Sequence, residues 1–234
     1  MLFLLFLLGL IWGSFLNVVI YRLPRDLSLL KPGSRCPYCG QALGFQELIP
    51  LLSFLIQKGR CKACGALISW RYFLIELLSG LGFAAVGLTA TSFFESVVGL
   101  AFFSFLLTSA FIDLEHKLLL NVLTIPGLVL GLAFSLLSWS IPFSAALAGA
   151  AAGFVIIFLI ILISRGGMGL GDAKFMALIG AFLGWQKVFY VLFSASLFGT
   201  LAGLTYLFLT KQGRKTPIPF GPFLALAAFI LYFY

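Results

Sequence analysis

Long apolar runs dominate the chain, and only one extended polar segment interrupts them. A transmembrane helix needs about 20 consecutive, mostly apolar residues, and eight stretches approach or reach that length. They are residues 2–21, 72–90, 94–111, 118–138, 143–164, 173–185, 188–210 and 217–234. The sixth stretch is the shortest. The pattern therefore predicts an all-α polytopic membrane protein with about eight transmembrane helices.

The composition excludes a soluble protein. Hydrophobic residues make up 62% of the chain and charged residues 9%, whereas soluble domains average roughly 45–50% and 25%. So little polar surface cannot cover a soluble globule of this size. No basic residue precedes the first apolar stretch, although a secretory signal peptide carries such residues. We therefore expect residues 2–21 to be a retained membrane span.

The distribution of charge predicts an orientation in the membrane. The polar segment 22–71 contains eight basic and two acidic residues, and with eight spans fourteen of the 15 basic residues fall on one side. Basic loops stay in the cytoplasm, so we expect this side to be cytoplasmic and both termini to be periplasmic. On so apolar a chain, the net charge of +8 indicates the inner loops of a membrane protein in contact with lipid, and not a nucleic-acid-binding protein.

All four cysteines lie in the polar segment, in two CxxC pairs. The pairs are CPYC at 36–39 and CKAC at 61–64, with 21 residues between them. Two such loops can present four thiolates to one tetrahedral Zn²⁺, and the glycine after each pair suits a knuckle turn with positive φ. We therefore predict a cytoplasmic zinc-knuckle insert over residues 22–71. Its metal ligands are Cys36, Cys39, Cys61 and Cys64.

Two other interpretations of the cysteines are a pair of disulfides and a rubredoxin-like iron site. Disulfides seldom persist in the reducing cytoplasm, so the predicted location favours a metal. Of the two metals, we place zinc ahead of iron. Four protein ligands leave no open coordination position, which is typical of a structural zinc. Such a zinc folds a module that is too small to build its own core.

Two aspartates stand at the ends of apolar stretches, where ionisable groups are expensive and usually functional. Asp113 closes the third stretch, and Asp172 opens the sixth. The predicted topology places both at the cytoplasmic membrane face. Two carboxylates that approach each other share one proton, so that one acts as general base and the other as general acid. The pair is therefore a candidate for metal-free peptide hydrolysis.

Each aspartate also has a structural interpretation of its own. Asp172 could be the N-cap of its helix, and Asp113 could pair with Lys117 four residues later. The glycines before Asp172 favour either close helix packing or close approach of a substrate backbone to the carboxylate. They are Gly166, Gly167, Gly169 and Gly171. Two aspartates at one membrane face, one of them flanked by glycines, favour catalysis.

Two further ionisable residues have simpler interpretations. His116 is the only histidine in the chain, and we expect it to lie at the membrane interface beside Glu115 and Lys117. Glu76 lies early in the second apolar stretch, near Arg71, and its simplest interpretation is an ion pair with Arg71. Neither residue by itself indicates a reaction.

The motifs together resemble the bacterial type IV prepilin peptidases, also called leader peptidase/N-methyltransferases. GSFLNVVIYRLP at 13–24 is similar to the family's first-span signature, and the CxxC knuckles resemble its zinc module. RYFLIELLSG, FIDLEHKLLLNVLTIP and GMGLGDAKFMALIGAFLGW are similar to its second-span entry and its two aspartate motifs. One departure is Leu120-Asn121, where the family commonly has Pro-Asn or Pro-Asp.

The resemblance implies a GxGD-type intramembrane aspartyl protease with Asp113 and Asp172 as its catalytic pair. It implies cleavage of the basic leader of type IV prepilins and pseudopilins at the cytoplasmic face. Methylation of the new N-terminus would follow, with S-adenosylmethionine as the methyl donor. The matching positions for this cofactor are Gly59, Arg71 and Glu76. The implied parts are a first transmembrane helix (1–21), the zinc insert (22–71) and the protease core (72–234).

An alternative function is a zinc-stabilised membrane transporter or assembly factor that uses the aspartates as an ion relay. Transporters usually hold such carboxylates near the midplane of the bilayer, often in paired broken helices. Here both aspartates are predicted at one membrane face. The sequence therefore favours the protease.

Overall fold

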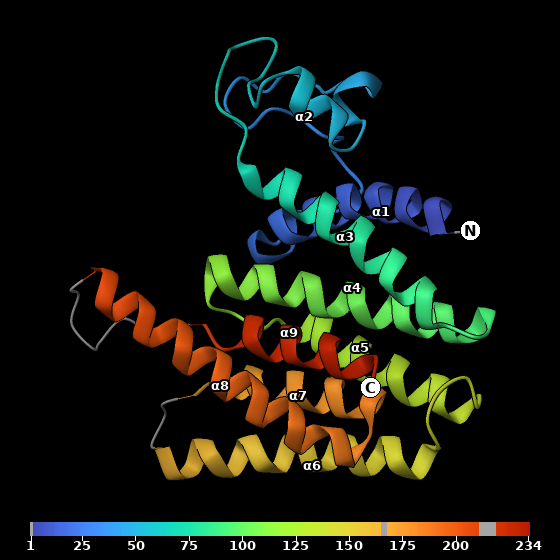
Figure 1. The fold of residues 1–234 in the computed structure, drawn as a ribbon. Coiled ribbons are helices and arrows are strands. Elements are labelled where there is room, and N and C mark those ends of the chain that lie inside the picture. Colours follow the sequence, from blue (N-terminus) through green and yellow to red (C-terminus); the bar gives the residue numbers. More distant parts are fainter. Residues whose placement is uncertain (1, 165–167, 211–218) are drawn as a thin grey trace. The chain divides into compact units, whose positions relative to one another are not determined.

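The computed structural model describes residues 2–164, 168–210 and 219–234, and these residues form helices and loops. In this part of the chain there is no β-strand, only two isolated β-bridges. The chain divides into two compact units, Met1–Thr91 and Ser92–Tyr234, and Figure 1 shows their helices. The predicted all-α fold is confirmed. The predicted division at residues 21 and 71 stays a prediction.

Two long helices and a loop-rich insert form the first unit. The long helices α1 (Leu2–Arg22) and α3 (Trp70–Thr89) pack closely against each other. A Cβ atom on Gly13 of α1 would lie 2.8 Å from the Cα atom of Glu76, so glycine permits this contact. The insert between them contains three short elements, η1 (Leu23–Arg25), η2 (Phe45–Leu48) and α2 (Leu52–Ile56).

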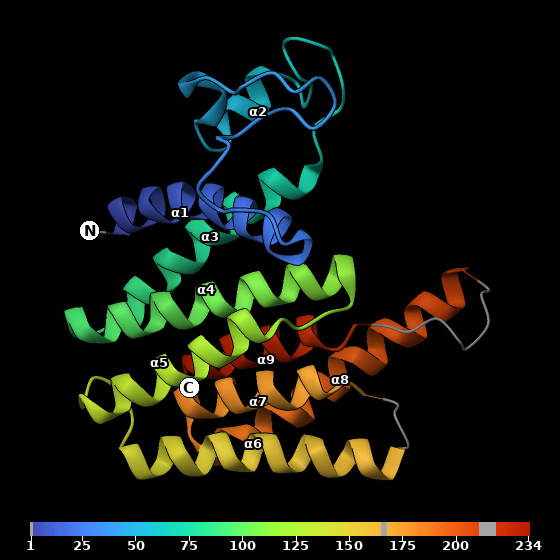
Figure 2. The ribbon, with the colours of Figure 1, turned by 180° about the vertical axis from the view of Figure 1, so that it is seen from behind.

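The second unit contains six helices among its described residues. They are α4 (Phe93–His116), α5 (Asn121–Leu136), α6 (Phe143–Ser164), α7 (Leu170–Leu183), α8 (Trp185–Thr210) and α9 (Gly221–Tyr232). Helix α7 lies between α6 on one side and α5 and α9 on the other (Figure 2). Ten of its 14 residues are buried, so the core of the unit forms around it.

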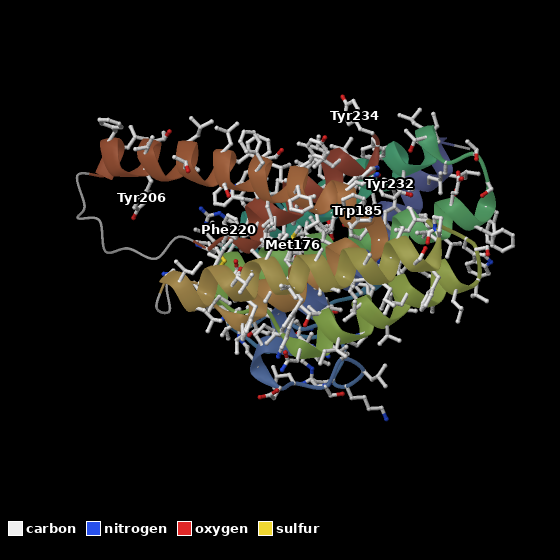
Figure 3. All side chains as sticks on the ribbon, turned by 90° about the horizontal axis from the view of Figure 1, so that it is seen from below. Met176, Trp185, Tyr206, Phe220, Tyr232 and Tyr234 are labelled. Atoms are coloured by element: carbon white, nitrogen blue, oxygen red, sulfur yellow. The ribbon has the colours of Figure 1, made fainter. Side chains whose placement is uncertain are left out.

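Tight packing holds α7 in place. A Cβ atom on Gly153 of α6 would lie 2.5 Å from the carbonyl oxygen of Met176, so the two backbones approach closely. Met176 lies among the helices of the unit, whereas Tyr206 extends from the far end of α8 (Figure 3). Because α7 is enclosed, the position of Asp172 in its first turn is fixed by the core.

Each of the eight predicted apolar stretches overlaps one of these helices. Five helices are long and apolar enough to cross a membrane, namely α1, α3, α4, α6 and α8. The chain is therefore a multi-pass membrane protein. Helix α7, with 14 residues, would extend only about 21 Å, which is shorter than the hydrocarbon core. The predicted count of eight spans stays a prediction. Gly166, Gly167 and the basic loop 211–216 lie outside the described residues.

Candidate active site

Asp113 lies in the last turn of α4, which ends at His116. The chain turns away at Lys117, which adopts φ 55° and donates its backbone N–H to the Asp113 carbonyl. The Asp113 side chain is buried, with 6% of its surface exposed. Its Oδ2 atom accepts a hydrogen bond of 2.9 Å from the backbone N–H of Gly221, the first residue of α9. The carboxylate is thus held between two helix termini.

Asp172 lies in the first turn of α7, as the third helical residue. The N-cap is Gly169, so the predicted N-cap role of Asp172 is wrong. The backbone N–H of Asp172 donates to the Gly169 carbonyl at 3.1 Å, and Oδ2 of Asp172 accepts from the Gly169 N–H at 3.1 Å. The bond from the Gly169 N–H to the Asp172 carboxylate is the half of a capping box that an acidic residue at the third helical position supplies. It orients the carboxylate on the helix that carries it.

The segments after Asp113 and around Asp172 meet. A Cβ atom on Gly171 would lie 2.9 Å from Cβ of Leu119, so a glycine lets the two backbones approach. The Lys174 ammonium donates to Oδ1 of Asn121 at 2.8 Å. These two contacts place the segment after Asp113 beside the first turn of α7. The structure therefore brings together the segments that carry the two predicted aspartates.

The sequence predicts two side-chain contacts at the end of α4, one between Asp113 and Lys117 and one between His116 and its neighbours. No ion pair joins Asp113 to Lys117 among the residues that the structure describes. His116 is half-buried, and its Nε2 lies 3.9 Å from the Glu115 carboxylate, as expected for neighbours at a helix end. Asp113 is thus held by the backbone of α9, a partner that the sequence did not indicate.

Gly221 supplies a contact to Asp113 that the sequence does not predict. It lies 108 residues from Asp113 in the chain, yet their hydrogen bond is buried. The only signal in the sequence is a Gly-Pro pair at 221–222, which suits the start of a helix. That signal predicts where α9 begins. It does not predict which helix α9 meets.

The four cysteines form one compact cluster in the first unit. All four are free thiols, so the disulfide alternative is not observed. Their sulfur atoms lie within 4.8 Å of one another, and Sγ of Cys36 lies 3.9 Å from Sγ of Cys64. Tetrahedral Zn²⁺ with bonds of about 2.3 Å needs sulfur atoms about 3.8 Å apart. The cluster therefore fits a zinc ion.

The two knuckles are near-copies of each other. In the first, Cys36 N–H donates to Gln41 and Gly40 N–H donates to Cys36; in the second, Cys61 N–H donates to Ala66 and Gly65 N–H to Cys61. Isolated bridges close them, Arg35 to Ala42 and Arg60 to Leu67. Gly40 has φ 70° and Gly65 has φ 72°. The glycines therefore supply the left-handed turn that the spacing predicted.

The thiols differ in how readily they ionise. The backbone N–H groups of Cys39 and Tyr38 lower the pKa of Cys36 to about 7. At Cys64 the Ala66 N–H also lowers the pKa, but desolvation and the neighbouring sulfur atoms outweigh it and raise the pKa to about 11. Four adjacent thiolates repel one another unless a cation is present, and a bound metal deprotonates its thiol ligands. This donor set suits a divalent metal.

The three residues matched to a cofactor site also lie in the first unit. Gly59 follows α2 with φ 67° and accepts the Ile68 N–H at 2.8 Å. Arg71, in the first turn of α3, places its guanidinium 4.9 Å from the centre of the Tyr72 ring. Buried Glu76 accepts the N–H of Leu51 at 2.8 Å. Gly59 and Glu76 thus have structural roles that need no cofactor.

Residues 7–90 match the Bacterial Peptidase A24 N-terminal domain, and residues 100–204 match the Type IV leader peptidase family. Each match falls within one of the two compact units. No solved structure matches the chain.

Several curated relatives, each called "Prepilin leader peptidase/N-methyltransferase", align with nearly the whole chain. The protein of Aeromonas salmonicida (strain A449) is 39% identical over 97% of this chain and 88% of its own length. The Bacillus subtilis (strain 168) protein is 38% identical over 100% and 94%. That of Myxococcus xanthus (strain DK1622) is 43% identical over 91% and 64%.

Proposed function

Because this chain belongs to the type IV leader peptidase family, we propose that it cleaves the basic leader peptides of type IV prepilins and pseudopilins at the cytoplasmic membrane face. It then methylates the new N-terminal residue. The observation that supports cleavage is the contact between the segments that carry Asp113 and Asp172, at the end of α4 and the start of α7, where each carboxylate accepts a backbone N–H. The ion-relay transporter is not favoured.

The two aspartates carry out hydrolysis as a pair that holds one proton. The ionised carboxylate removes a proton from water, whose oxygen attacks the scissile carbonyl carbon. The protonated carboxyl group gives its proton to the carbonyl oxygen. The tetrahedral intermediate then collapses, the C–N bond breaks, and the leaving amine takes a proton from the pair. A pair of interacting carboxylates titrates as a unit, so we assign no fixed role to either residue.

The proposed membrane placement follows from the basic loops. The insert, the end of α4 and the start of α7 face the cytoplasm, and both termini face the periplasm of the inner membrane. A prepilin that is anchored in the same membrane would then present its basic leader at the level of the aspartates. Membrane lipid contacts the exposed apolar side chains of the spanning helices.

We also propose that the cysteine cluster holds a structural zinc. Cys36, Cys39, Cys61 and Cys64 supply four thiolates, which leaves no open position for water or substrate. When bound, the zinc ties the two knuckles together and folds the insert. No step of leader cleavage depends on it.

The methyl donor in this proposal is S-adenosylmethionine. The support for it is the name of the curated relatives. Because Glu76 bonds to Leu51 and Gly59 forms a turn, the described contacts of these two residues do not build a site for the donor. Their assignment, with that of Arg71, stays a prediction, and no step is derived from it.

The test uses the full-length protein in detergent or nanodiscs with a synthetic prepilin peptide. Mass spectrometry should detect loss of the leader, and labelled S-adenosylmethionine should transfer a methyl group to the trimmed product. Intact peptide after prolonged incubation with folded, zinc-loaded protein would overturn the proposal. Proton-coupled ion flux in liposomes without peptide cleavage would favour the transporter instead.

A further inference from the structure

Each aspartate of the site has one oxygen atom bound by a backbone N–H. Oδ2 of Asp172 accepts from Gly169 at 3.1 Å, and Oδ2 of Asp113 accepts from Gly221 at 2.9 Å. The first bond is local, because Gly169 is three residues from Asp172. The second comes from α9, a helix that neither aspartate motif includes.

We propose that Gly221, at the start of α9, is a positioning residue of the aspartate pair. Its N–H holds Oδ2 of Asp113 as the oxygen of this carboxyl group that carries no proton. An N–H donor stabilises a charged acceptor oxygen, and an oxygen that binds a proton accepts such a bond poorly. With both Oδ2 atoms engaged in this way, the Oδ1 atoms are left to carry the shared proton. This inference rests on the proposed protease function.

The first turn of α9 has one donor available for this purpose. Pro222 has no backbone N–H, while the N–H groups of Phe223 and Leu224 donate to the Phe220 carbonyl at 3.1 and 3.2 Å. The Gly221 N–H is thus the one left to point outwards, and it meets Asp113. The positive end of the helix dipole of α9 adds to this favourable environment for a carboxylate.

The position of the Asp113 carboxylate also requires that residue 221 has no side chain. A Cβ atom there would lie 2.7 Å from Oδ2 of Asp113, 3.2 Å from its Cγ and 3.3 Å from its Cβ. The carboxylate would have to move before any larger residue fits. Gly221 is also buried, so the displaced carboxylate has little room. Glycine at this position therefore sets the place of Asp113 by contact as well as by hydrogen bonding.

The first test is Gly221→Ala, with Gly199→Ala as its matched control. Gly199 lies in α8, where the heavy atom nearest to an added Cβ atom would be a ring carbon of Phe223 at 3.4 Å, an ordinary contact. For Gly221→Ala we expect kcat for leader cleavage to fall about tenfold to a hundredfold, because a small misplacement of a reacting group has effects of that size. KM should stay within about twofold, since Gly221 contacts Asp113 and not the substrate. The control should cleave like the unmodified protein.

A second variant removes the donor without adding an atom. Glycolic acid in place of Gly221 converts the amide to an ester, and the same ester at residue 199 is its control. We expect at least about a tenfold loss of kcat at residue 221 only, as is typical for a hydrogen bond to a charged group. This variant decides the question if Gly221→Ala does not fold, as judged by thermal unfolding.

The outcomes separate this inference from the proposed function. Wild-type kcat in the folded ester variant, with Asp113→Asn inactive, would overturn the role of Gly221 and leave the protease intact. A raised KM with unchanged kcat would also overturn it, because Gly221 would then act on substrate binding. If Asp113→Asn itself cleaves normally, the aspartate mechanism fails.

Discussion

The cysteine cluster and the aspartate pair are both built from two similar groups, but they are assembled in different ways. The cysteines lie on two copies of one short turn, and each turn forms its own hydrogen bonds. Cys36 and Cys61 occupy equivalent places, as do Gly40 and Gly65. The aspartates lie on unlike elements, the end of α4 and the start of α7. Their geometry depends on helices that pack around them.

This difference separates local from tertiary control. A knuckle turn is fixed by about ten consecutive residues, so damage to it should stay within the insert. The aspartate pair depends on α4, α7 and α9 together, because Gly221 reaches Asp113 from 108 residues away. We therefore expect changes in the first unit to affect metal binding, and changes in the second unit to affect cleavage. Four experiments test that separation.

The largest effect is expected from Asp113→Asn and Asp172→Asn. Each should lower leader cleavage by about 10²–10⁴-fold, the usual contribution of a general acid or base. The amide cannot exchange the proton, yet its oxygen can still accept the N–H of Gly221 or Gly169. Zinc content and thermal unfolding should therefore stay unchanged. Cleavage is measured by mass spectrometry under single-turnover conditions.

The control for this experiment is Glu95→Gln. Glu95 lies in the first turn of α4, about 27 Å along the helix from Asp113 at 1.5 Å per residue. Its removal should leave cleavage nearly unchanged. Substantial cleavage by either folded Asn variant would show that the aspartates do not act as a pair.

Removing the metal should have the next largest effect. This effect should be confined to the first unit, which contains the four cysteines. Cys61→Ser should reduce bound zinc from about one ion per chain to near zero, because structural sites need all four ligands. Elemental analysis of protein purified without chelator measures this, and limited proteolysis reports loosening of the insert. Brief treatment of the native protein with a chelator should not stop cleavage. Immediate loss of cleavage on chelation would break the proposed separation.

A smaller effect is expected at the knuckle glycines. Gly40→Ala and Gly65→Ala place a Cβ atom at φ 70° and 72°, a conformation that costs an L-residue about 1–2 kcal/mol. Each should weaken zinc binding about fivefold to thirtyfold in competition with a chromophoric chelator. Gly33→Ala is the control, because an added Cβ atom there meets nothing within 4 Å. Unequal effects at Gly40 and Gly65 would show that the two knuckles are not equivalent.

The same contrast explains what the sequence could predict. The CxxC spacing and the glycines describe complete local turns, so the cysteine cluster follows from the pattern without knowledge of the fold. The two aspartates could be selected because charged groups are rare in apolar stretches. Their partners could not, since nothing in the PFGP sequence at 219–222 says that α9 begins beside Asp113. The sequence also misplaces the N-cap of α7, because the carboxylate that bonds the N-cap N–H stands at the third helical position, three residues after Gly169.

The smallest effect is expected from the bond between Lys174 and Asn121, which joins the segments that carry the two aspartates. The bond is exposed, so it should contribute about 0.5–1 kcal/mol, near the low end for hydrogen bonds. Lys174→Met and Asn121→Ala should each lower kcat for cleavage about threefold. The double variant should be no worse than either single one, because both remove the same interaction.

Lys187→Met is the matched control for Lys174→Met. Lys187 donates to the Leu231 carbonyl at 3.0 Å, and Leu231 lies ten residues after Gly221 in α9, about 15 Å along the helix. Its loss affects the end of α9 that is remote from Asp113, so cleavage should stay near the wild-type rate. If the losses from Lys174→Met and Asn121→Ala multiply in the double variant, the two residues act independently. The segments that carry the aspartates are then aligned by the packing of Gly171 on Leu119 and by the contact with α9.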